Sequence, residues 1–493
     1  MASLSRLPRT PVALAMSLFL VACASTHGLT PEARTLDADN LAVTRSLGSS
    51  SDAAFPRSDW WKSLGDAQLD ALIEEALAGT PNLDAADARV RQAIAQAGLA
   101  DAARKPTVGA TAQYSGVLIP ETVAPEPLGG EYQGIGLLGL NFKYSPDLWG
   151  GHRARWQSAL GQARAAEVDA QAARLMLSSN IAQAYVALAQ SHDALDVANQ
   201  EQQRSRLLLD LGQQRVKAGL DNQLQIRQAQ SAVASAEQQA QAAQQRIDAA
   251  RNAVAALLGK GPDRGLEITR PTLLATSTPG VPSVLPSELL GHRPDVVAAR
   301  WRVEAAAHGI DASKAEFYPT INLSALVGLA SGSLSNVFSS DALLAQGGPA
   351  LSLPIFDGGR LRNQLAKSNA DYDLAVATYS QTLVGALREV ADALQATRSL
   401  DGQIVSATQA RDAAQDAWEI ATTRYRAGLG TQIDVLTAQR PLLQLDQQLA
   451  TLRAQRFVAT IDLDRALGGG LEPVAPASVS EASISSSAKA PTP

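Results

Sequence analysis

The sequence has a single cysteine, Cys23, among its 493 residues, so no disulfide bond can form within the chain. Aromatic residues make up only 4% of the chain, and charged residues make up 18%. No run of lysine or arginine stands out and the formal net charge is −6, which gives no electrostatic footprint for nucleic acid. Beyond residue 22 no apolar stretch reaches the roughly 18 residues that a transmembrane helix needs, so none is expected there.

The sequence also lacks recognisable catalytic and cofactor motifs. No G-x-S-x-G, Walker A or H-E-x-x-H motif occurs, and the five histidines show no metal-ligand spacing. A G-x-G-x-x-G match at 134–139 lies inside an alternating strand pattern, whereas a nucleotide site needs these glycines between a strand and a helix. We therefore expect close strand packing at 134–139, and we expect neither an enzyme nor a cofactor.

The single cysteine lies at the end of an export signal. Arg6 and Arg9 precede an apolar run at 12–22, which is too short to span a membrane as a mature helix. Residues 20–23 read Leu-Val-Ala-Cys, which resembles the lipobox of bacterial lipoproteins. That resemblance implies cleavage before Cys23 and its lipidation (palmitate included), and more than one acyl chain gives stable anchoring. A chance cysteine after an ordinary signal peptide is the alternative.

The rest of the chain contains two copies of one unit. RVKAGLDNQLQIRQAQ at 215–230 returns as RYRAGLGTQIDVLTAQR at 424–440, and both stretches contain Arg-x-x-Ala-Gly-Leu. A second pair is GGHRAR at 150–155 and GGRLR at 358–362. Each copy is predicted to run helix, strand, strand, long helix, tip phrase, long helix. Two copies at this spacing indicate duplication rather than a solenoid of many repeats.

The predicted boundaries follow from these matches. A signal peptide at 1–22 and a lipidated leader at 23–58 precede the first repeat at 59–261, with strands at about 106–118 and 131–145 and long helices at about 151–217 and 222–258. An equatorial linker at 262–292 leads to the second repeat at 293–470, with strands at about 319–330 and 345–356 and long helices at about 358–426 and 432–467. The Ser-, Ala- and Pro-rich tail at 471–493 is predicted to be disordered.

Heptad spacing predicts the long helices. Leucine, isoleucine, valine or alanine recurs at steps of three or four residues, with Ser191 at one intervening position: Leu177, Ile181, Ala184, Leu188, Leu195 and Ala198, and again Leu383, Leu387, Val390 and Leu394. This pattern favours coiled-coil packing. No proline interrupts 151–217 or 358–426, so each helix would be roughly 100 Å long, too long for one globular domain. An ordinary structural coiled coil remains open on this evidence alone.

Four segments alternate between apolar and polar residues, at 107–118, 132–144, 320–329 and 345–356. The fourth pattern is weaker, because Pro349 and Pro354 lack the amide hydrogen that a sheet uses. Segments of about ten residues with one apolar face are typical of transmembrane barrel strands, although strands of a soluble sheet have the same period. The export signal and the absence of any other membrane segment favour the membrane interpretation.

Four strands cannot close a barrel, because the smallest outer-membrane barrels have about eight. The sheet edges must then pair with other copies, since an open edge in lipid leaves backbone groups without hydrogen-bond partners. The sequence thus predicts an obligate oligomer, in which three copies of four strands would give twelve. The residues alone leave two, three or four copies open.

Together, the lipobox, the duplicated unit, the tip phrases and RPDV at 293–296 resemble the TolC-like outer membrane efflux proteins. More narrowly, they resemble the lipoprotein branch that serves RND (resistance-nodulation-division) pumps. The resemblance implies a mainly α fold with a transmembrane β-barrel, in which a homotrimer joins a twelve-stranded β-barrel in the outer membrane to a long periplasmic α-barrel. It implies an exit duct for drugs or other small molecules delivered by a periplasmic adaptor (membrane fusion) protein and an inner-membrane RND pump.

The same resemblance implies two sets of site residues. The adaptor-docking tips would be Arg215, Ala218, Gly219 and Leu220 in the first copy and Arg424, Ala427, Gly428 and Leu429 in the second. The periplasmic gate would comprise Asp434, Thr437 and Arg440, with Thr437 at a position where many members have aspartate. A plain helix turn and a solvated carboxylate are the alternatives.

Two other functions remain open for this sequence. The outer-membrane component of a type I protein secretion system would use the same fold. A periplasmic coiled-coil lipoprotein without a pore would explain the heptads but not the alternating strands.

Overall fold

The computed structural model describes residues 26–36, 41, 56–120, 122–123, 130, 132–273, 291–332 and 336–471. The predicted signal peptide, the lipidation site Cys23 and the tail beyond residue 471 lie outside the described residues. So do much of the lipidated leader and the central part of the predicted linker, 274–290.

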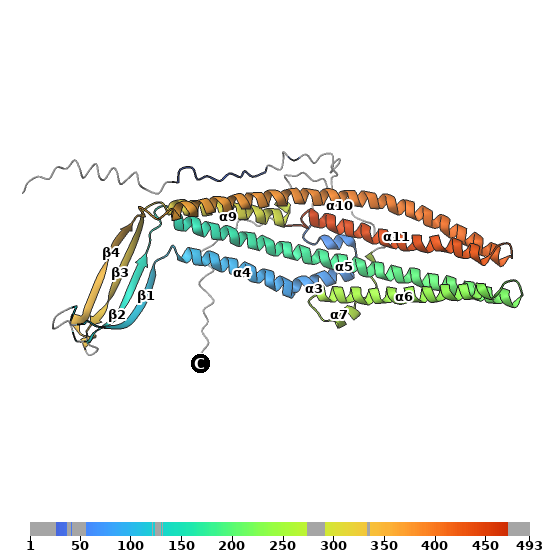
Figure 1. The fold of residues 1–493 in the computed structure, drawn as a ribbon, viewed down its shortest axis with the longest axis horizontal. Coiled ribbons are helices and arrows are strands. Elements are labelled where there is room, and N and C mark those ends of the chain that lie inside the picture. The colour runs from blue at the N-terminus through green and yellow to red at the C-terminus, as the bar shows by residue number, and fades with distance from the viewer. Residues whose placement is uncertain are drawn as a thin grey trace, which may run out of the picture. The chain divides into compact units, whose positions relative to one another are not determined.

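The described part of the chain is mainly helical, with one antiparallel sheet (Figure 1). In chain order the elements are η3 Trp60–Leu64, α3 Ala67–Ala78, α4 Pro81–Ala102, β1 Thr107–Leu118, β2 Tyr132–Tyr144, α5 Gly151–Lys217, α6 Gln223–Leu257, α7 Pro262–Leu266, α9 Pro294–Ala315, β3 Thr320–Ser331, η6 Ser340–Ala342, β4 Leu343–Ser352, α10 Arg360–Arg426 and α11 Gln432–Ala466. The helices α5 and α10 have 67 residues each, and α6 and α11 have 35 each, so both copies have the same lengths.

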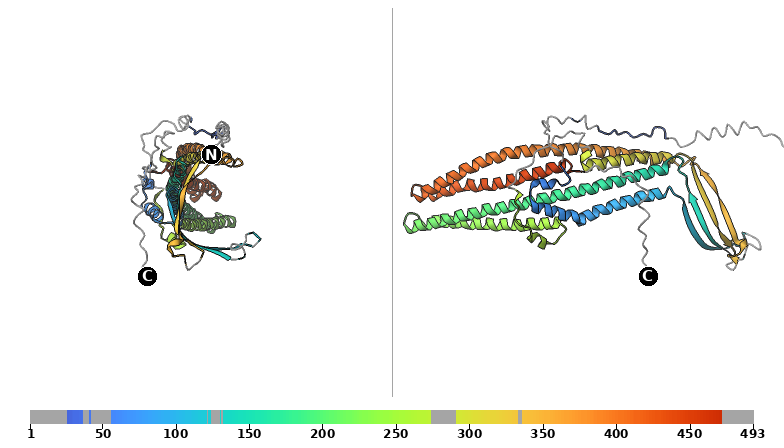
Figure 2. Two further views of the ribbon diagram at one scale, coloured as in Figure 1. Left: turned by 90° about the vertical axis from the view of Figure 1, so that its left-hand side faces the viewer. Right: turned by 180° about the vertical axis from the view of Figure 1, so that it is seen from behind.

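The chain forms two compact units that cut across the duplication. The sheet unit comprises 1–36, 87–168 and 298–381, and the hairpin unit comprises 37–86, 169–297 and 382–493. Each unit takes segments from both repeats, so neither repeat is a compact body by itself. Within the hairpin unit, the α5–α6 and α10–α11 hairpins lie side by side in both directions of view (Figures 1 and 2).

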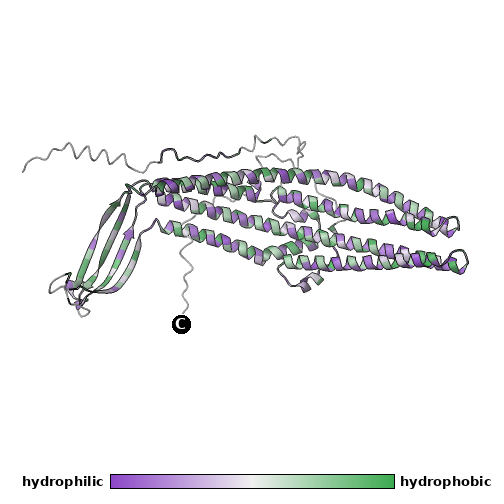
Figure 3. Ribbon diagram, in the orientation of Figure 1, coloured by the Kyte–Doolittle hydropathy of each residue, from purple (hydrophilic) through white to green (hydrophobic). Residues whose placement is uncertain are grey.

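The heptad positions form the core of the hairpin unit, as the sequence predicts. Ile181 and Leu188 of α5 are fully buried, as are Leu383 and Val390 of α10. The α5 positions pack in a cluster with Trp60, Trp61 and residues of α3, α6 and α11. Each fully buried leucine or isoleucine contributes roughly 2 kcal/mol to folding through the hydrophobic effect. Polar and apolar residues alternate along the helices (Figure 3), and no described helix is long and apolar enough to cross a membrane.

A buried arginine explains the RPDV motif. Arg293, which is 6% exposed, forms hydrogen bonds to both carboxylate oxygens of Asp295 at 3.0 and 2.7 Å and to Glu389 of α10 at 3.0 Å. Its remaining amino group donates to the carbonyl of Ala466 at the end of α11, at 2.9 Å. Arg293 therefore ties the start of α9 and the end of α11 to α10.

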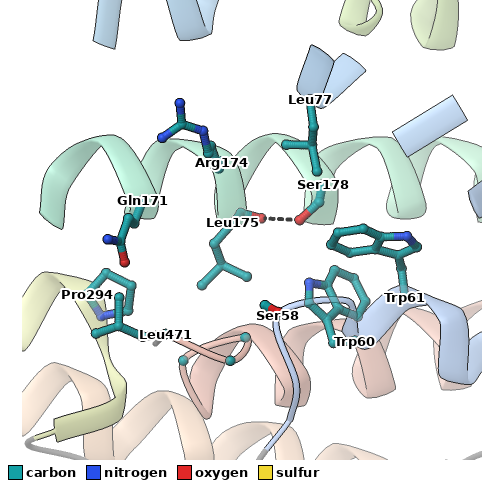
Figure 4. Close-up of a pocket in the computed structure, with 13 residues that line it drawn as sticks. Ser58, Trp60, Trp61, Leu77, Gln171, Arg174, Leu175, Ser178, Pro294 and Leu471 are labelled. Atoms are coloured by element: carbon teal, nitrogen blue, oxygen red, sulfur yellow. Dashed lines mark hydrogen bonds between the residues drawn. The ribbon is translucent and has the colours of Figure 1, made fainter. Parts of the chain in front are cut away.

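A cavity of about 260 Å³ lies beside η3 in the hairpin unit (Figure 4). Its apolar wall comes from Trp60, Leu175 of α5 and Leu471, and Arg174 and Gln171 lie on the same helix. Ser178 donates to the carbonyl of Leu175 at 2.9 Å and so stays within α5. The cavity therefore lies between η3, α5 and the end of the second repeat.

The strands form one sheet in the order β1-β2-β3-β4, with antiparallel neighbours throughout. The register places Val108 opposite Phe142, and Phe142 opposite Ala325, so the apolar positions of adjacent strands share one face. The alternation predicted from the sequence is therefore continuous across the sheet. On the other face Asn141 donates to Thr111 at 2.8 Å.

The fourth strand differs from its predicted bounds of 345–356. It occupies Leu343–Ser352 and stops before Pro354, which has no amide hydrogen to extend the ladder. Pro349 is tolerated because β4 lies at the edge of the sheet within one chain.

The glycines of the G-x-G-x-x-G match lie within β2, as the sequence analysis expects. The side chain of Tyr114 covers Gly134, where an added Cβ would lie 2.3 Å from the tyrosine hydroxyl. Gly134 and Gly136 make room for the Tyr114 ring on β1, whereas Gly139 lies against Leu326 and the backbone of β3.

Candidate functional site

The two tip phrases form the same helix ending. In the first copy, the amide of Leu220 donates to the carbonyl of Arg215 at 2.9 Å, and that of Gly219 donates to Val216 at 3.0 Å. In the second copy, Leu429 donates to Arg424 at 2.8 Å, with a matching Gly428 bond at 3.0 Å. This is the Schellman motif, which needs a left-handed residue after the helix, and Gly219 and Gly428 have φ of 74° and 76°. Arg-x-x-Ala-Gly-Leu therefore encodes a helix stop.

A capping box begins the next helix in each copy. Asn222 and Gln225 cap α6, and Thr431 and Asp434 cap α11. Asp434 accepts hydrogen bonds from the amide and hydroxyl of Thr431 at 2.7 and 2.8 Å, and these bonds lower the pKa of the Asp434 carboxyl. Gln225 likewise accepts from the Asn222 amide at 3.0 Å. Gln225 and Asp434 therefore differ in charge but have the same capping role.

A polar bridge joins the two tips. Arg215 donates to Asp221 at 2.8 Å and to the carbonyl of Tyr425 at 3.1 Å, and its guanidinium lies over the Tyr425 ring, 4.4 Å from its centre. The Tyr425 hydroxyl donates to Asp221 at 2.7 Å. We call these three residues the tip bridge; it links α5 of the first hairpin to α10 of the second.

The tip bridge perturbs the titration of its members. Burial opposes ionisation of Asp221, but hydrogen bonds from Arg215 and Tyr425 outweigh it, and the pKa of Asp221 falls below its ordinary value. Burial, reinforced by Asp221, raises the pKa of Tyr425 to about 12. The bridge therefore contains an aspartate anion and a neutral tyrosine at neutral pH.

The predicted docking residues are mostly exposed. Ala218, Gly219 and Leu220 lie on the surface of the first tip, and the corresponding Ala427, Gly428 and Leu429 lie on the second. Leu224 and Ile433, which the sequence analysis did not single out, are also exposed and extend the apolar surface onto α6 and α11. The two arginines differ: Arg215 is turned into the tip bridge, whereas Arg424 is exposed.

The predicted gate residues lie on the first three turns of α11. Asp434, Thr437 and Arg440 are all exposed and recur every three residues, so they follow one side of the helix. Pro441 lies inside α11 and cannot donate to the carbonyl of Thr437, one turn earlier. Asp434 and Arg440 form no ion pair with each other in the described part of the chain.

A buried polar network lies farther along the same hairpins. Glu201 of α5 accepts hydrogen bonds from Arg204 at 3.2 Å and from Gln439 of α11 at 2.6 Å. Asp446 of α11 accepts from Arg411 of α10 at 3.0 Å. Burial raises the pKa of Glu201 despite its neighbours. This network crosslinks three helices by side chains that sequence reasoning did not connect.

The tip bridge was also missed from the sequence. Asp221 aligns with Gly430 in the other copy, and Tyr425 aligns with Val216. The sequence did contain a signal for the tip bridge. Within a phrase that is otherwise repeated, Tyr425 occurs only in the second copy and Asp221 only in the first. The repeat drew attention to what the copies share, whereas the bridge uses residues that differ.

A membrane-type sheet joined to paired helical hairpins defines the class of outer membrane efflux channels, and comparison with known proteins agrees. The family model described as "Outer membrane efflux protein" matches the chain twice, at 72–260 and 285–469, one match for each copy. The chain belongs to this family of TolC-like outer membrane efflux channels.

Named relatives cover most of the chain. The fusaric acid resistance protein FusA of Burkholderia cepacia is 41% identical over 367 residues, covering 72% of this chain and 68% of FusA. The multidrug resistance outer membrane protein MdtP of Escherichia coli is 32% identical over 435 residues, covering 85% and 88%. The crystal structure of the outer membrane protein VceC of Vibrio cholerae matches with a TM-score of 0.78 and 38% identity, covering 85% of this chain and all of VceC.

Proposed function

We propose that this protein is the exit duct of a tripartite pump, in which a homotrimer passes drugs or other small molecules from a periplasmic adaptor and an inner-membrane RND pump to the exterior. The observations that carry the proposal are the two equal hairpins and the four-stranded sheet, in which most apolar residues share one face, with Ile135, Leu137 and Leu326 as exceptions. Three such sheets would supply twelve strands and close a transmembrane β-barrel without open edges.

The tips are the proposed docking surface for the adaptor. Both tips expose a leucine on the glycine turn and a second aliphatic side chain at the start of the next helix. The Schellman motifs and capping boxes fix the backbone around these side chains, so little ordering entropy opposes docking. Docking on the tips would place the adaptor beside the gate.

The start of α11 is the proposed gate, with Asp434, Thr437 and Arg440 facing the pore. A ring of Asp434 carboxylates from three copies would favour cations. The tip bridge is the proposed lock, because it joins the second hairpin, which carries the gate residues, to the first. Opening would then require the bonds between Tyr425 and the first hairpin to break.

Lipidation of Cys23 is the proposed anchor. The lipobox precedes the leader, and acyl chains on this residue would hold the N-terminus at the outer membrane independently of the strands. Cys23→Ser should leave the protein in the cell envelope but abolish labelling by radioactive palmitate.

Leakage through the gate tests the proposal in cells. Asp434→Ala and Arg440→Ala should sensitise a producing strain to an antibiotic too large for ordinary porins. Thr408→Ala, on α10 outside the gate and the bridge, is the control and should not. If both gate variants assemble normally in the outer membrane and susceptibility is unchanged, the constriction lies elsewhere.

A further inference from the structure

Gln432, the first residue of α11, is a buried polar side chain near the tip of the second hairpin and is only 2% exposed. Neither its amide oxygen nor its amide nitrogen has a hydrogen-bond partner among the residues that the structure describes. The large majority of buried side-chain amides do have partners, because an unpaired one loses the hydrogen bonds that it makes with water. The burial of Gln432 therefore needs an explanation.

The first copy shows that the start of the helix does not require this burial. Gln223 is the first residue of α6 and occupies the same place in the repeated phrase, yet it is exposed to solvent. Both helices begin with a capping box, which is formed by the residue before the glutamine and the residue two places after it. The glutamine takes no part in either box. The second copy thus buries an amide that its own helix does not need to bury.

The contact that buries Gln432 is made between the two hairpins. Gly212 of α5 is itself buried, and a Cβ added to it would lie 3.9 Å from the amide nitrogen of Gln432. The matching position of α10 is Ala421, so the glycine belongs to the first copy alone. Glycine inside a helix is less favourable than alanine. The first hairpin therefore has a less stable helix where it lies against the amide.

The neighbouring contacts between the hairpins favour their packing. One turn farther along α11, Val435 packs with Leu208 of α5 and Tyr425 of α10 in an apolar cluster. Tyr425 also belongs to the tip bridge, where its hydroxyl donates to Asp221. Packing of the hairpins therefore buries an unpaired amide next to contacts that stabilise the same arrangement. Movement of α11 away from α5 would return this amide to water.

We propose that Gln432 opposes the tip bridge and thereby sets how readily the duct opens. The bridge and the apolar cluster favour packed hairpins, whereas Gln432 regains hydrogen bonds to water when the hairpins separate. The cost of one unpaired buried group corresponds to a factor of about ten in the ratio of open to closed tips. This inference rests on the proposed duct and its lock.

Two substitutions at Gln432 test the inference in opposite directions. Gln432→Met keeps the size of the side chain and removes the unpaired amide. We expect its unfolding temperature to rise and its single-channel openings in a planar bilayer to become about tenfold less frequent. Gln432→Glu keeps the shape but buries a charge, which costs more than burying an amide. Its openings at pH 7 should be about tenfold more frequent than those of the wild type, or more.

The first copy supplies the matched controls. Gln223→Met and Gln223→Glu make the same changes at the first position of α6, where the helix dipole acts on the new side chain in the same way. Because Gln223 is exposed, neither control should change the opening frequency. All five proteins are full-length and purified, and their unfolding temperatures are measured by circular dichroism.

A lower unfolding temperature for Gln432→Met than for Gln223→Met would show that the amide is hydrogen-bonded in the folded protein, and would overturn the inference. Equal opening frequencies in the variants at 432 and 223 would overturn it as well. Should Gln432→Glu fail to assemble, the two methionine variants decide. If none of the proteins conducts, the proposed duct fails, and the unfolding temperatures still decide whether the buried amide is unpaired.

Discussion

At the scale of single residues, the tip bridge concentrates several interactions in one place. Arg215 and Asp221 are only 14% and 12% exposed, so their ion pair is better shielded than the surface pairs of the long helices. Tyr425 adds a hydrogen bond to the same carboxylate and is itself fully buried. A substitution in the tip bridge should therefore weaken the link between the two hairpins directly.

Acid should weaken the tip bridge. Because the pKa of Asp221 is lowered in the folded protein, its contribution to stability is complete above the ordinary aspartate pKa of about 4 and is lost as pH falls through the lowered value. Thermal unfolding of the wild type and Asp221→Asn should therefore differ at pH 7, and the difference should shrink as the pH falls below about 4. Differences that persist unchanged in acid would mean that Asp221 is not acting as an anion.

Asp434 can be assigned to capping or to the gate by two substitutions. Asp434→Asn keeps an oxygen that can accept from Thr431 but removes the charge, whereas Asp434→Ala removes both. We expect Asn to reduce cation selectivity while α11 stays as stable as in the wild type. Thr431→Ala should cost about 1 kcal/mol of stability without changing selectivity. A selectivity loss in Thr431→Ala equal to that of Asn would contradict a separate role for the charge.

At the scale of elements, the long helices and the strands were predictable because their periodicity extends over many residues. The heptad positions Ile181 and Val390 are buried as predicted, and the alternation at 132–144 becomes one face of β2. The end of the fourth strand was harder to place, because apolar residues continue to Phe356 beyond the proline that stops the ladder.

The glycine of each helix stop should be sensitive to substitution. Gly219→Ala and Gly428→Ala force a side chain into the left-handed region, which costs about 1 to 2 kcal/mol each. Gly402→Ala, inside α10 with open space around it, should instead be neutral or slightly stabilising. Chemical unfolding followed by circular dichroism measures all three. Equal tolerance at 219 and 402 would show that the tip backbone is not fixed.

Arg293 should be the most costly arginine to remove. Arg293→Met removes the hydrogen bonds to Asp295, to Glu389 and to the carbonyl at the end of α11. Both carboxylates are partly exposed and regain water, so we expect a cost of about 1.5 to 3 kcal/mol, as for hydrogen bonds to charged groups. Arg300→Met, at an exposed ion pair on α9, should cost well under 1 kcal/mol. The two variants are compared by denaturant midpoints, and similar midpoints would contradict the role of Arg293 in tying α9 and α11 to α10.

At the scale of the whole molecule, the duplication was visible in the sequence, but the compact units were not. The repeat matches give sequential copies, whereas each unit takes segments from both repeats. The tip bridge illustrates the reason, because Asp221 and Tyr425 come from different copies and lie 204 positions apart. Local patterns carry no information about such pairs. The gate and docking assignments came from family resemblance, while the geometry supplied the caps and the bridge.

The conductance of single channels tests the central claim most directly, namely that this chain forms a duct locked at its tips. The purified full-length protein is placed in a planar lipid bilayer, alone and as Asp221→Asn with Tyr425→Phe. The wild type should open rarely and at low conductance, and the double variant should show larger and longer openings, because the link between the hairpins is lost. A correctly folded trimer that never conducts, with or without these substitutions, would contradict the account.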